Sequence, residues 1–169
     1  MPRIAMLTAN NVSQQTEHGG NRLSRALFQE LRRLGYEEGR NLTVERYALE
    51  GRLEALGSII EQIAASRPDL IYMSNPTFAK RFIEAGVRTI PIVGSWPDPI
   101  AVGLTTSLAK PSGNITGVVL DAGIGMVAKR LDMLQQLQPG MKHLAHLGPL
   151  YLWNTQGGYA EGAREIAQK

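Results

Sequence analysis

Short apolar runs and segments of helical spacing alternate along the chain from its first residues to about Leu120. The runs are rich in Ile, Leu and Val, which is typical of strands buried on both faces. They predict five strands, at 4–9, 42–47, 70–73, 90–93 and 115–120. Between them, apolar residues recur every three or four positions, which predicts amphipathic helices over 23–34, 53–64 and 76–85.

Strands that alternate with helices predict an α/β fold with a doubly wound parallel sheet. Right-handed crossovers restrict the topology, and we expect five strands in the order 2-1-3-4-5. Residues that typically begin or end helices support these boundaries. Pro76 suits the first position of a helix, and Gly35 and Gly86 directly follow the helices that they end.

After Leu120 the pattern is too short to complete a second sheet. It predicts a helix over 127–137, a strand over 144–147 and a helix over 159–169. One strand with a helix on either side cannot form an independent sheet. We therefore expect a first lobe over 1–120 and an incomplete second α/β lobe over 121–169.

Composition narrows the class of protein. The 169 residues suffice for one domain with a core, and the net charge of +3 comes without the basic stripe that nucleic-acid binding needs. The absence of cysteine excludes disulfides, thiolate metal sites and a cysteine nucleophile. No apolar run is long enough to span a membrane. Residues 1–7 read as a strand, so either the protein stays in the cytoplasm or an export signal has been removed.

A binding site is expected where the strand order reverses, between the first and third strands. In open parallel sheets, ligands bind outside the carboxyl ends of the strands at that point. The residues that follow the strands are neutral donors and acceptors, two carboxylates and one indole. They are Thr8, Asn10, Ser74, Asn75, Thr77, Ser95, Trp96, Asp98 and Asp121.

Several of these residues also have a structural interpretation. Ser74 or Asn75 before Pro76 suits a helix N-cap, and the same amides could equally receive an anionic group. Asp98, between two prolines, suits a turn, or it pairs with a ligand ammonium. Trp96 either packs in the core or faces the cleft and stacks on a ligand.

The segment from Ser95 to Gly117 combines rigid prolines with permissive glycines, which suits a loop held at one edge of a cleft. It predicts a strand end, a turn, a short helix, a second turn and a new strand.

Signals of catalytic or metal chemistry are weak. Gly123, Gly125 and Ala128 match a dinucleotide fingerprint, but they lie outside the first βαβ unit and no acid follows about 20 residues on. His143 and His146 would face opposite sides of a strand and so could not share a metal. We therefore expect no catalytic residue, no metal and no cofactor.

An ordered set of short motifs resembles one family. The set extends from Leu23 to Pro139 without large gaps. It comprises LRRLGYEEGRNLTVE at 31–45, EGR at 50–52, PDLI at 68–71, TIPIV at 89–93, the pairs 98–99 and 103–104, SLAKPSGNITG at 107–117 and KRL at 129–131. This set is similar to that of the ABC-transporter substrate-binding proteins of the tryptophan/tyrosine-binding type, which have the type I periplasmic-binding-protein fold.

The resemblance implies two α/β lobes that close by hinge motion on a small amino-acid-like or aromatic solute. It implies a periplasmic or otherwise extracytoplasmic protein, not an enzyme, that delivers the solute to an ABC permease. By position, Asn75, Pro76, Thr77 and Asp98 match the family's ligand-contacting loops, whereas the loop 8–16 matches poorly. On this hypothesis the amino end of the third helix takes a carboxylate, Asp98 takes an ammonium, and Trp96 stacks on the solute.

Two rival functions are open at this point. A small flavodoxin-like enzyme of the hydrolase type would use the same cleft with His18 and nearby serines, although no nucleophile–base pair is visible. A self-associating interaction module would instead form a homodimer through an apolar stripe of the incomplete second lobe. The stripe consists of Val127, Leu131, Leu134 and Leu137.

Overall fold

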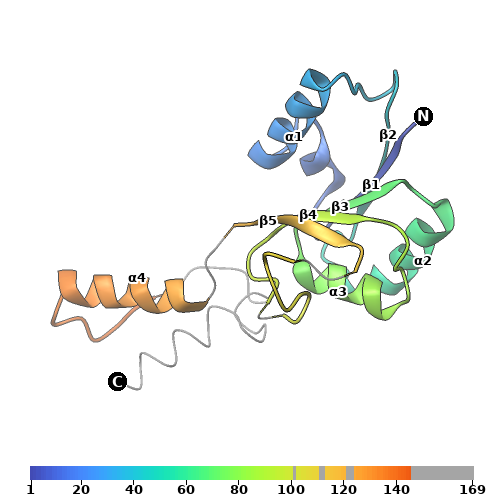
Figure 1. Cartoon of the computed structure of the whole chain (residues 1–169). Helices are drawn as coiled ribbons and strands as arrows, with labels where there is room; N and C mark the ends of the chain where they lie inside the picture. Colours follow the sequence, from blue (N-terminus) through green and yellow to red (C-terminus); the bar gives the residue numbers. More distant parts are fainter. Residues whose placement is uncertain (101, 111–112, 121–123, 146–169) are drawn as a thin grey trace.

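The computed structural model describes residues 1–100, 102–110, 113–120 and 124–145 (Figure 1). Its five strands form one parallel sheet in the order β2-β1-β3-β4-β5, which confirms the predicted topology. The strands are β1 (Arg3–Thr8), β2 (Thr43–Ala48), β3 (Leu70–Met73), β4 (Ile92–Trp96) and β5 (Ile115–Val119).

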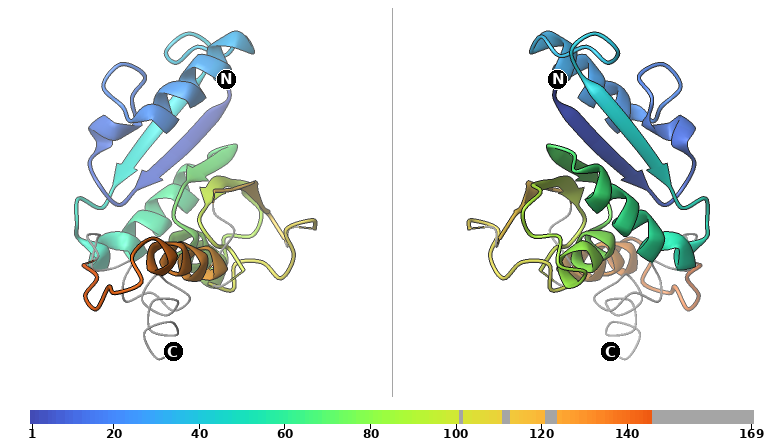
Figure 2. Two further views of the ribbon diagram at one scale, coloured as in Figure 1. Left: turned by 90° about the vertical axis from the view of Figure 1, so that its left-hand side faces the viewer. Right: turned by 90° about the vertical axis from the view of Figure 1, so that its right-hand side faces the viewer.

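Helices cover the two faces of the sheet unequally. Helix α1 (Arg22–Arg33) lies on one face beside β1 and β2, whereas α2 (Leu56–Ser66) and α3 (Pro76–Glu84) lie on the other (Figures 1 and 2). The short 3₁₀ turns η1 (Val12–Gln15) and η2 (Leu53–Ala55) precede α1 and α2. Helix α4 (Ile124–Leu137) follows β5 and projects away from the sheet (Figure 1).

The main core lies between the sheet and the helices α2 and α3. Parallel pairing aligns Ala5, Ile71 and Ile92 at one level of three neighbouring strands, so their side chains share a face. All three are completely buried, as are Ile63 of α2 and Phe82 of α3, which belong to the same cluster. Burial of apolar surface on this face is therefore the main force that holds α2 and α3 on the sheet.

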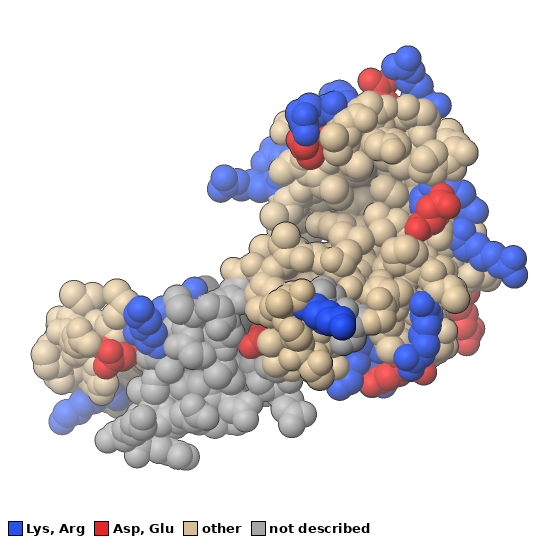
Figure 3. All heavy atoms as spheres, in the orientation of Figure 1, with Lys and Arg blue, Asp and Glu red and all other residues tan. Residues whose placement is uncertain are grey.

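The opposite face is covered only in part. Phe28 of α1 is buried, and the Arg46 guanidinium of β2 lies 5.5 Å from the centroid of its ring. On the β5 side of the same face, Val118 keeps 62% and Leu120 keeps 55% of its surface exposed. The surface is hollowed between α1 and this part of the sheet, and charged side chains lie mainly around the rim of the hollow (Figure 3).

Two glycines and an indole fix the junction of β4 and β5. Gly94 and Gly117 are register partners, and the Trp96 ring lies against both of them. A Cβ on Gly94 would lie 2.1 Å from the Met73 carbonyl oxygen and 2.4 Å from Cη2 of Trp96. The indole Nε1–H donates a hydrogen bond to the Thr116 carbonyl oxygen at 3.2 Å. Trp96 is only 3% exposed and belongs to the main core.

We expect Gly94→Ala to lower the free energy of unfolding by about 3 kcal/mol or more. The added methyl group would clash with the Met73 carbonyl oxygen and the Trp96 ring, which cannot both move away. Gly57→Ala is the matched control, since Gly57 lies inside α2 with no atom within 4 Å of the added Cβ. It should raise stability by about 0.5–1 kcal/mol. Urea unfolding of both variants measures the difference, and equal stabilities would contradict this account.

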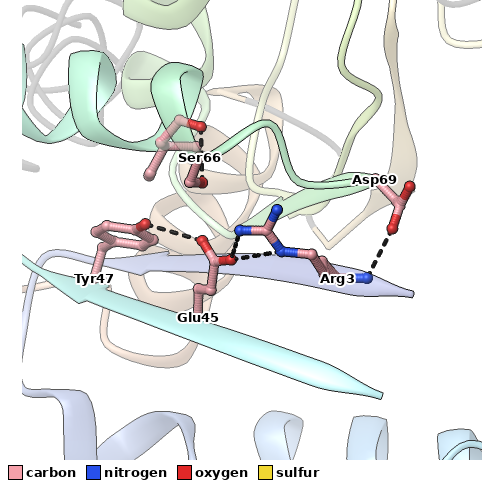
Figure 4. A network of polar contacts seen from close by, with 6 residues as sticks. Arg3, Glu45, Tyr47, Ser66 and Asp69 are labelled. Carbon is pink, nitrogen blue, oxygen red and sulfur yellow. Dashed lines mark hydrogen bonds and ion pairs between the residues drawn. The ribbon is translucent and has the colours of Figure 1, made fainter. Parts of the chain in front are cut away.

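A polar network joins β1 to β2 beside Ser66, the last residue of α2 (Figure 4). The Arg3 guanidinium donates to Oε1 of Glu45, with Nε at 3.0 Å, and the Tyr47 hydroxyl donates to Oε2 of Glu45 at 3.0 Å. Burial acts to raise the pKa of Glu45, but hydrogen bonds from Ser66, Arg3 and Tyr47 outweigh it, so the pKa lies below its ordinary value. The Arg3 backbone N–H also donates to Oδ2 of Asp69 at 2.8 Å.

The lowered pKa of Glu45 makes the stability depend on acid pH. The unfolded chain binds this proton more readily than the folded one, so the stabilisation is present above the ordinary carboxyl pKa of about 4.3 and is lost as pH falls through the lower folded value. Glu45→Gln should cost about 1 kcal/mol near pH 7, and the gap to wild type should narrow as pH falls below the ordinary carboxyl pKa. Denaturant unfolding over this pH range measures it, with Glu61→Gln on the exposed side of α2 as control. A gap that persists unchanged at pH 3 would refute the assignment.

Three details differ from the expectations. Strand β4 ends at Trp96 rather than Val93. The described residues between β4 and β5 form turns and bends, and the predicted short helix is wrong there. The side chain of Thr105 accepts from the Ser107 N–H and donates to the Ser107 carbonyl oxygen, and these local bonds compete with a helix. Leu144 and Ala145 do not lie in a strand, and the rest of the predicted sixth strand, like the helix 159–169, lies outside the described residues.

Helix α4 spans 124–137, which confirms a helix at this point, and Met133 and Leu137 on it are exposed. The division into lobes at residue 120, and self-association through this helix, stay predictions. Within the described ranges, no helix combines the length and the apolar character that crossing a membrane requires.

Candidate functional site

The parallel register brings three hydroxyl side chains to one level at the carboxyl edge of the sheet. Leu7 pairs with Met73, and Met73 pairs with Gly94. The residues that follow these three therefore lie side by side on or just after neighbouring strands. They are Thr8, Ser74 and Ser95. They have the opposite parity from the core residues, and therefore point to the α1 face. We call Thr8, Ser74 and Ser95 the hydroxyl row.

The members of the hydroxyl row differ in burial. Ser74 is exposed, Thr8 is half-buried, and Ser95 keeps only 5% of its surface exposed. The Thr8 hydroxyl accepts a hydrogen bond from the Asn10 backbone N–H at 3.3 Å. The Ser95 hydroxyl is buried and has no hydrogen-bond partner among the described residues. The row therefore carries no formal charge, and Ser74 and Thr8 are its accessible members.

Asn75 is the N-cap of α3. Its Oδ1 accepts hydrogen bonds from the backbone N–H groups of Thr77 at 2.9 Å and Phe78 at 3.2 Å, and Pro76 occupies the first helical position. Of the roles considered from the sequence, Asn75 therefore has the structural one, the N-cap of α3. An anion that approached this helix end would meet the Asn75 amide and the exposed Ser74 hydroxyl first, and the positive end of the helix dipole would favour it.

Trp96 lies on the other face of the sheet from the hydroxyl row. Its parity is that of Ile92 and Gly94, and its ring packs in the core against the two glycines. The structure therefore has Trp96 packed in the core and not facing a cleft. Stacking on a ligand would require the ring to leave that position.

The other predicted residues are distributed around the same edge. Asn10 is exposed in the loop after β1, and its Nδ2 donates to Oε1 of Gln14 at 3.3 Å. Thr77 is exposed in the first turn of α3, and Asp98 is half-buried in the turn after β4. Asp121 lies outside the described residues.

The structure adds one segment that the sequence analysis did not single out for a site. The turn after β2 is tied to the loop after β1, because the N–H groups of Glu50 and Gly51 donate to the carbonyl oxygens of Asn10 and Ala9, both at 3.2 Å. Glu50 has a φ of +50° and Gly51 a φ of +83°. The Glu-Gly dipeptide was the available signal, since glycine often marks such turns.

The described side chains that gather at this edge are mainly hydroxyls and amides. In the part of the chain that the structure describes, no three His, Asp or Glu side chains gather in a way that could hold a metal ion. The arrangement can hydrogen-bond a small polar molecule.

We expect Asn75→Ala to lower the free energy of unfolding by about 1 kcal/mol, because two backbone N–H groups of α3 lose their acceptor. Asn75→Asp should keep wild-type stability, since Asp caps as well as Asn and its charge suits the helix amino end. Thermal unfolding of the two variants distinguishes them. An alanine variant as stable as wild type would mean that the cap contributes nothing.

A doubly wound lobe with neutral hydrogen-bonding groups at its carboxyl edge has the features of a solute-binding protein. The sequence profile of the ABC transporter substrate binding proteins matches residues 10–148. The chain belongs to this family, which is a substrate-binding and not an enzymatic one, as the sequence motifs implied.

Known relatives agree with this assignment. The tyrosine-binding protein of Clostridioides difficile is 27% identical over 135 residues, which cover 79% of this chain and 38% of that protein. A solved conserved domain protein from Vibrio cholerae superposes with a TM-score of 0.71 at 21% identity, over 99% of this chain and 52% of the other. An ABC domain from Streptococcus pneumonia in complex with L-Trp gives 0.63 at 21% identity, over 82% of this chain and 44% of the other. The chain thus spans about half or less of the length of these relatives.

Proposed function

We propose that this chain forms one half of a cleft that binds a small amino-acid-like or aromatic solute for an ABC importer. The observation that carries the proposal is the hydroxyl row beside the amino end of α3, at the strand-order reversal of a doubly wound sheet. Ligands of such sheets bind at this place. The names of the relatives, a tyrosine-binding protein and a domain in complex with L-Trp, support an aromatic amino acid as solute.

The carboxylate of the solute is assigned to the β1–β3 side of the site. Ser74 and Thr8 are hydroxyls that can donate to it, and the Asn75 amide and the dipole of α3 add further attraction. The solute ammonium needs a carboxylate at the same edge, and Asp98 is the candidate that the sequence predicts. Thr77, Asn10 and Ser95 would complete the polar contacts.

The importer role follows from the family and is part of the proposal. A substrate-binding protein of an ABC importer works outside the cytoplasm and passes its solute to a membrane permease. Closure of a second lobe on the solute would supply contacts from the side that faces away from the hydroxyl row.

A charge-reversal test addresses the carboxylate assignment directly. Asn75→Asp keeps the helix cap but places a negative charge where the solute carboxylate would lie, so it should weaken L-tyrosine and L-tryptophan binding by about tenfold or more. Ser74→Ala should weaken binding by about 3- to 10-fold through one lost hydrogen bond. Isothermal titration calorimetry of the folded protein measures both.

Gln62→Glu is the matched control, because it adds the same charge on the exposed side of α2 and should leave binding unchanged. If the folded wild-type protein binds neither amino acid, nor any other in a panel, the proposed function is wrong. If Asn75→Asp binds as tightly as wild type, only the placement of the carboxylate is wrong.

A further inference from the structure

The turn after β2 contains a residue that its backbone conformation does not favour. Leu49 to Arg52 form a four-residue turn, closed by a hydrogen bond from the Arg52 N–H to the Leu49 carbonyl oxygen at 2.8 Å. Both central residues, Glu50 and Gly51, have positive φ. Turns of this kind favour Asn, Asp or Gly at the first central position, because Gly has no Cβ to clash and the short polar side chains of Asn and Asp hydrogen-bond locally.

Among the described residues, the contacts of Glu50 compensate little for that strain. Its carboxylate approaches the Arg52 guanidinium at 3.5 Å, but both side chains are more than half exposed, and an ion pair of this kind contributes little. The residue is not buried against the core either. Asn or Gly at position 50 would therefore make the turn more stable, and the carboxylate contributes little to the stability of the fold.

The surrounding backbone nevertheless holds Glu50 firmly at the carboxyl edge. The N–H groups of Leu49, Glu50 and Gly51 donate to the carbonyl oxygens of Thr8, Asn10 and Ala9 at 3.0–3.2 Å. Leu49, the first residue of the turn, is completely buried and packs in the main core. A strained residue that its neighbours over-determine in this way is often part of a binding site.

The turn that carries Glu50 lies beyond the β1 end of the hydroxyl row. Ala48 is the register partner of Thr8, and the Glu50 N–H donates to the Asn10 carbonyl oxygen, so Glu50 follows the row by two residues at about one strand spacing, roughly 5 Å, from the β1 side. Asp98 follows β4, at the other end of the row, about three spacings or roughly 14 Å from the β2 side. Glu50 and Asp98 therefore follow strands at opposite ends of the row.

We propose that Glu50 holds the ammonium group of the solute, in preference to Asp98. This inference rests on the proposed function, and it assigns the orientation of the solute: ammonium toward the turn after β2, carboxylate toward Ser74 and the amino end of α3. The β2 and β3 sides are two strand spacings apart, roughly 10 Å, which leaves room for an α-amino acid with a hydrogen bond at each of its charged groups.

The test couples a change in the protein to the same change in the ligand. The ligands are L-tryptophan, L-tyrosine and their analogues without the amino group, indole-3-propionate and 3-(4-hydroxyphenyl)propionate. For the wild-type protein, calorimetry should give at least about tenfold weaker binding of the analogues. For Glu50→Gln this discrimination should fall to about twofold or less, because the residue that recognises the amino group is gone.

Glu50→Asn separates this role from a role in the turn. Asn suits a positive φ, so the melting temperature of this variant should equal or exceed that of wild type, while discrimination for the amino group is lost as in Glu50→Gln. Glu61→Gln, the same loss of charge on α2, is the control and should keep wild-type discrimination.

The possible results separate the two proposals. A folded wild-type protein that binds neither amino acid overturns the proposed function and this inference with it. Amino-acid binding in which Glu50→Gln discriminates as well as wild type overturns the inference alone. Loss of discrimination in both Glu50 variants, with Glu61→Gln unchanged, supports it.

Discussion

The parallel register of β1, β3 and β4 is the constraint on which the site depends. It places residues from three distant parts of the sequence at one level of the sheet, and the twofold repeat of a strand then decides which face each side chain joins. Ile71 and Ile92 enter the core because of it, and Ser74 and Ser95 reach the α1 face for the same reason. A shift of one residue in β4 would exchange Ser95 with a core position, so the apolar packing on one face also maintains the polar row on the other.

Trp96 links these two faces. Its ring needs the bare backbone of Gly94 and Gly117 to lie flat on the β4–β5 junction, and its Nε1–H donates to the Thr116 carbonyl oxygen. The ring thereby closes the core at the carboxyl end of β4, where a loosely packed strand end would be free to twist. Ser95, one residue earlier, is held on the opposite face. Trp96, which the sequence suggested as a stacking residue, contributes instead to the position of Ser95.

The sequence sufficed for the strands, the main helices and the strand order, because buried parallel strands are nearly continuous apolar runs. It also located the carboxyl edge, because residues that follow strands in a doubly wound sheet gather there. It could not decide the place of Trp96, since that depends on two glycines being register partners across β4 and β5. Nor could it identify Glu50, because a backbone angle is not visible in a residue type that seldom adopts it. The short helix expected before β5 failed because Thr105 and Ser107 satisfy backbone groups locally.

Ser95 connects stability with binding. A buried hydroxyl that lacks a partner among the described residues costs the folded state about 1–3 kcal/mol compared with a satisfied one. Apolar packing on the core face tolerates this cost, because the hydrophobic contribution of that face is much larger. A solute group that hydrogen-bonds Ser95 would offset the cost on binding, so part of the affinity would come from a penalty that the free protein already carries. The same reasoning applies to the strained turn at Glu50. At both positions a different residue would make the local structure more stable, and both positions lie at the carboxyl edge.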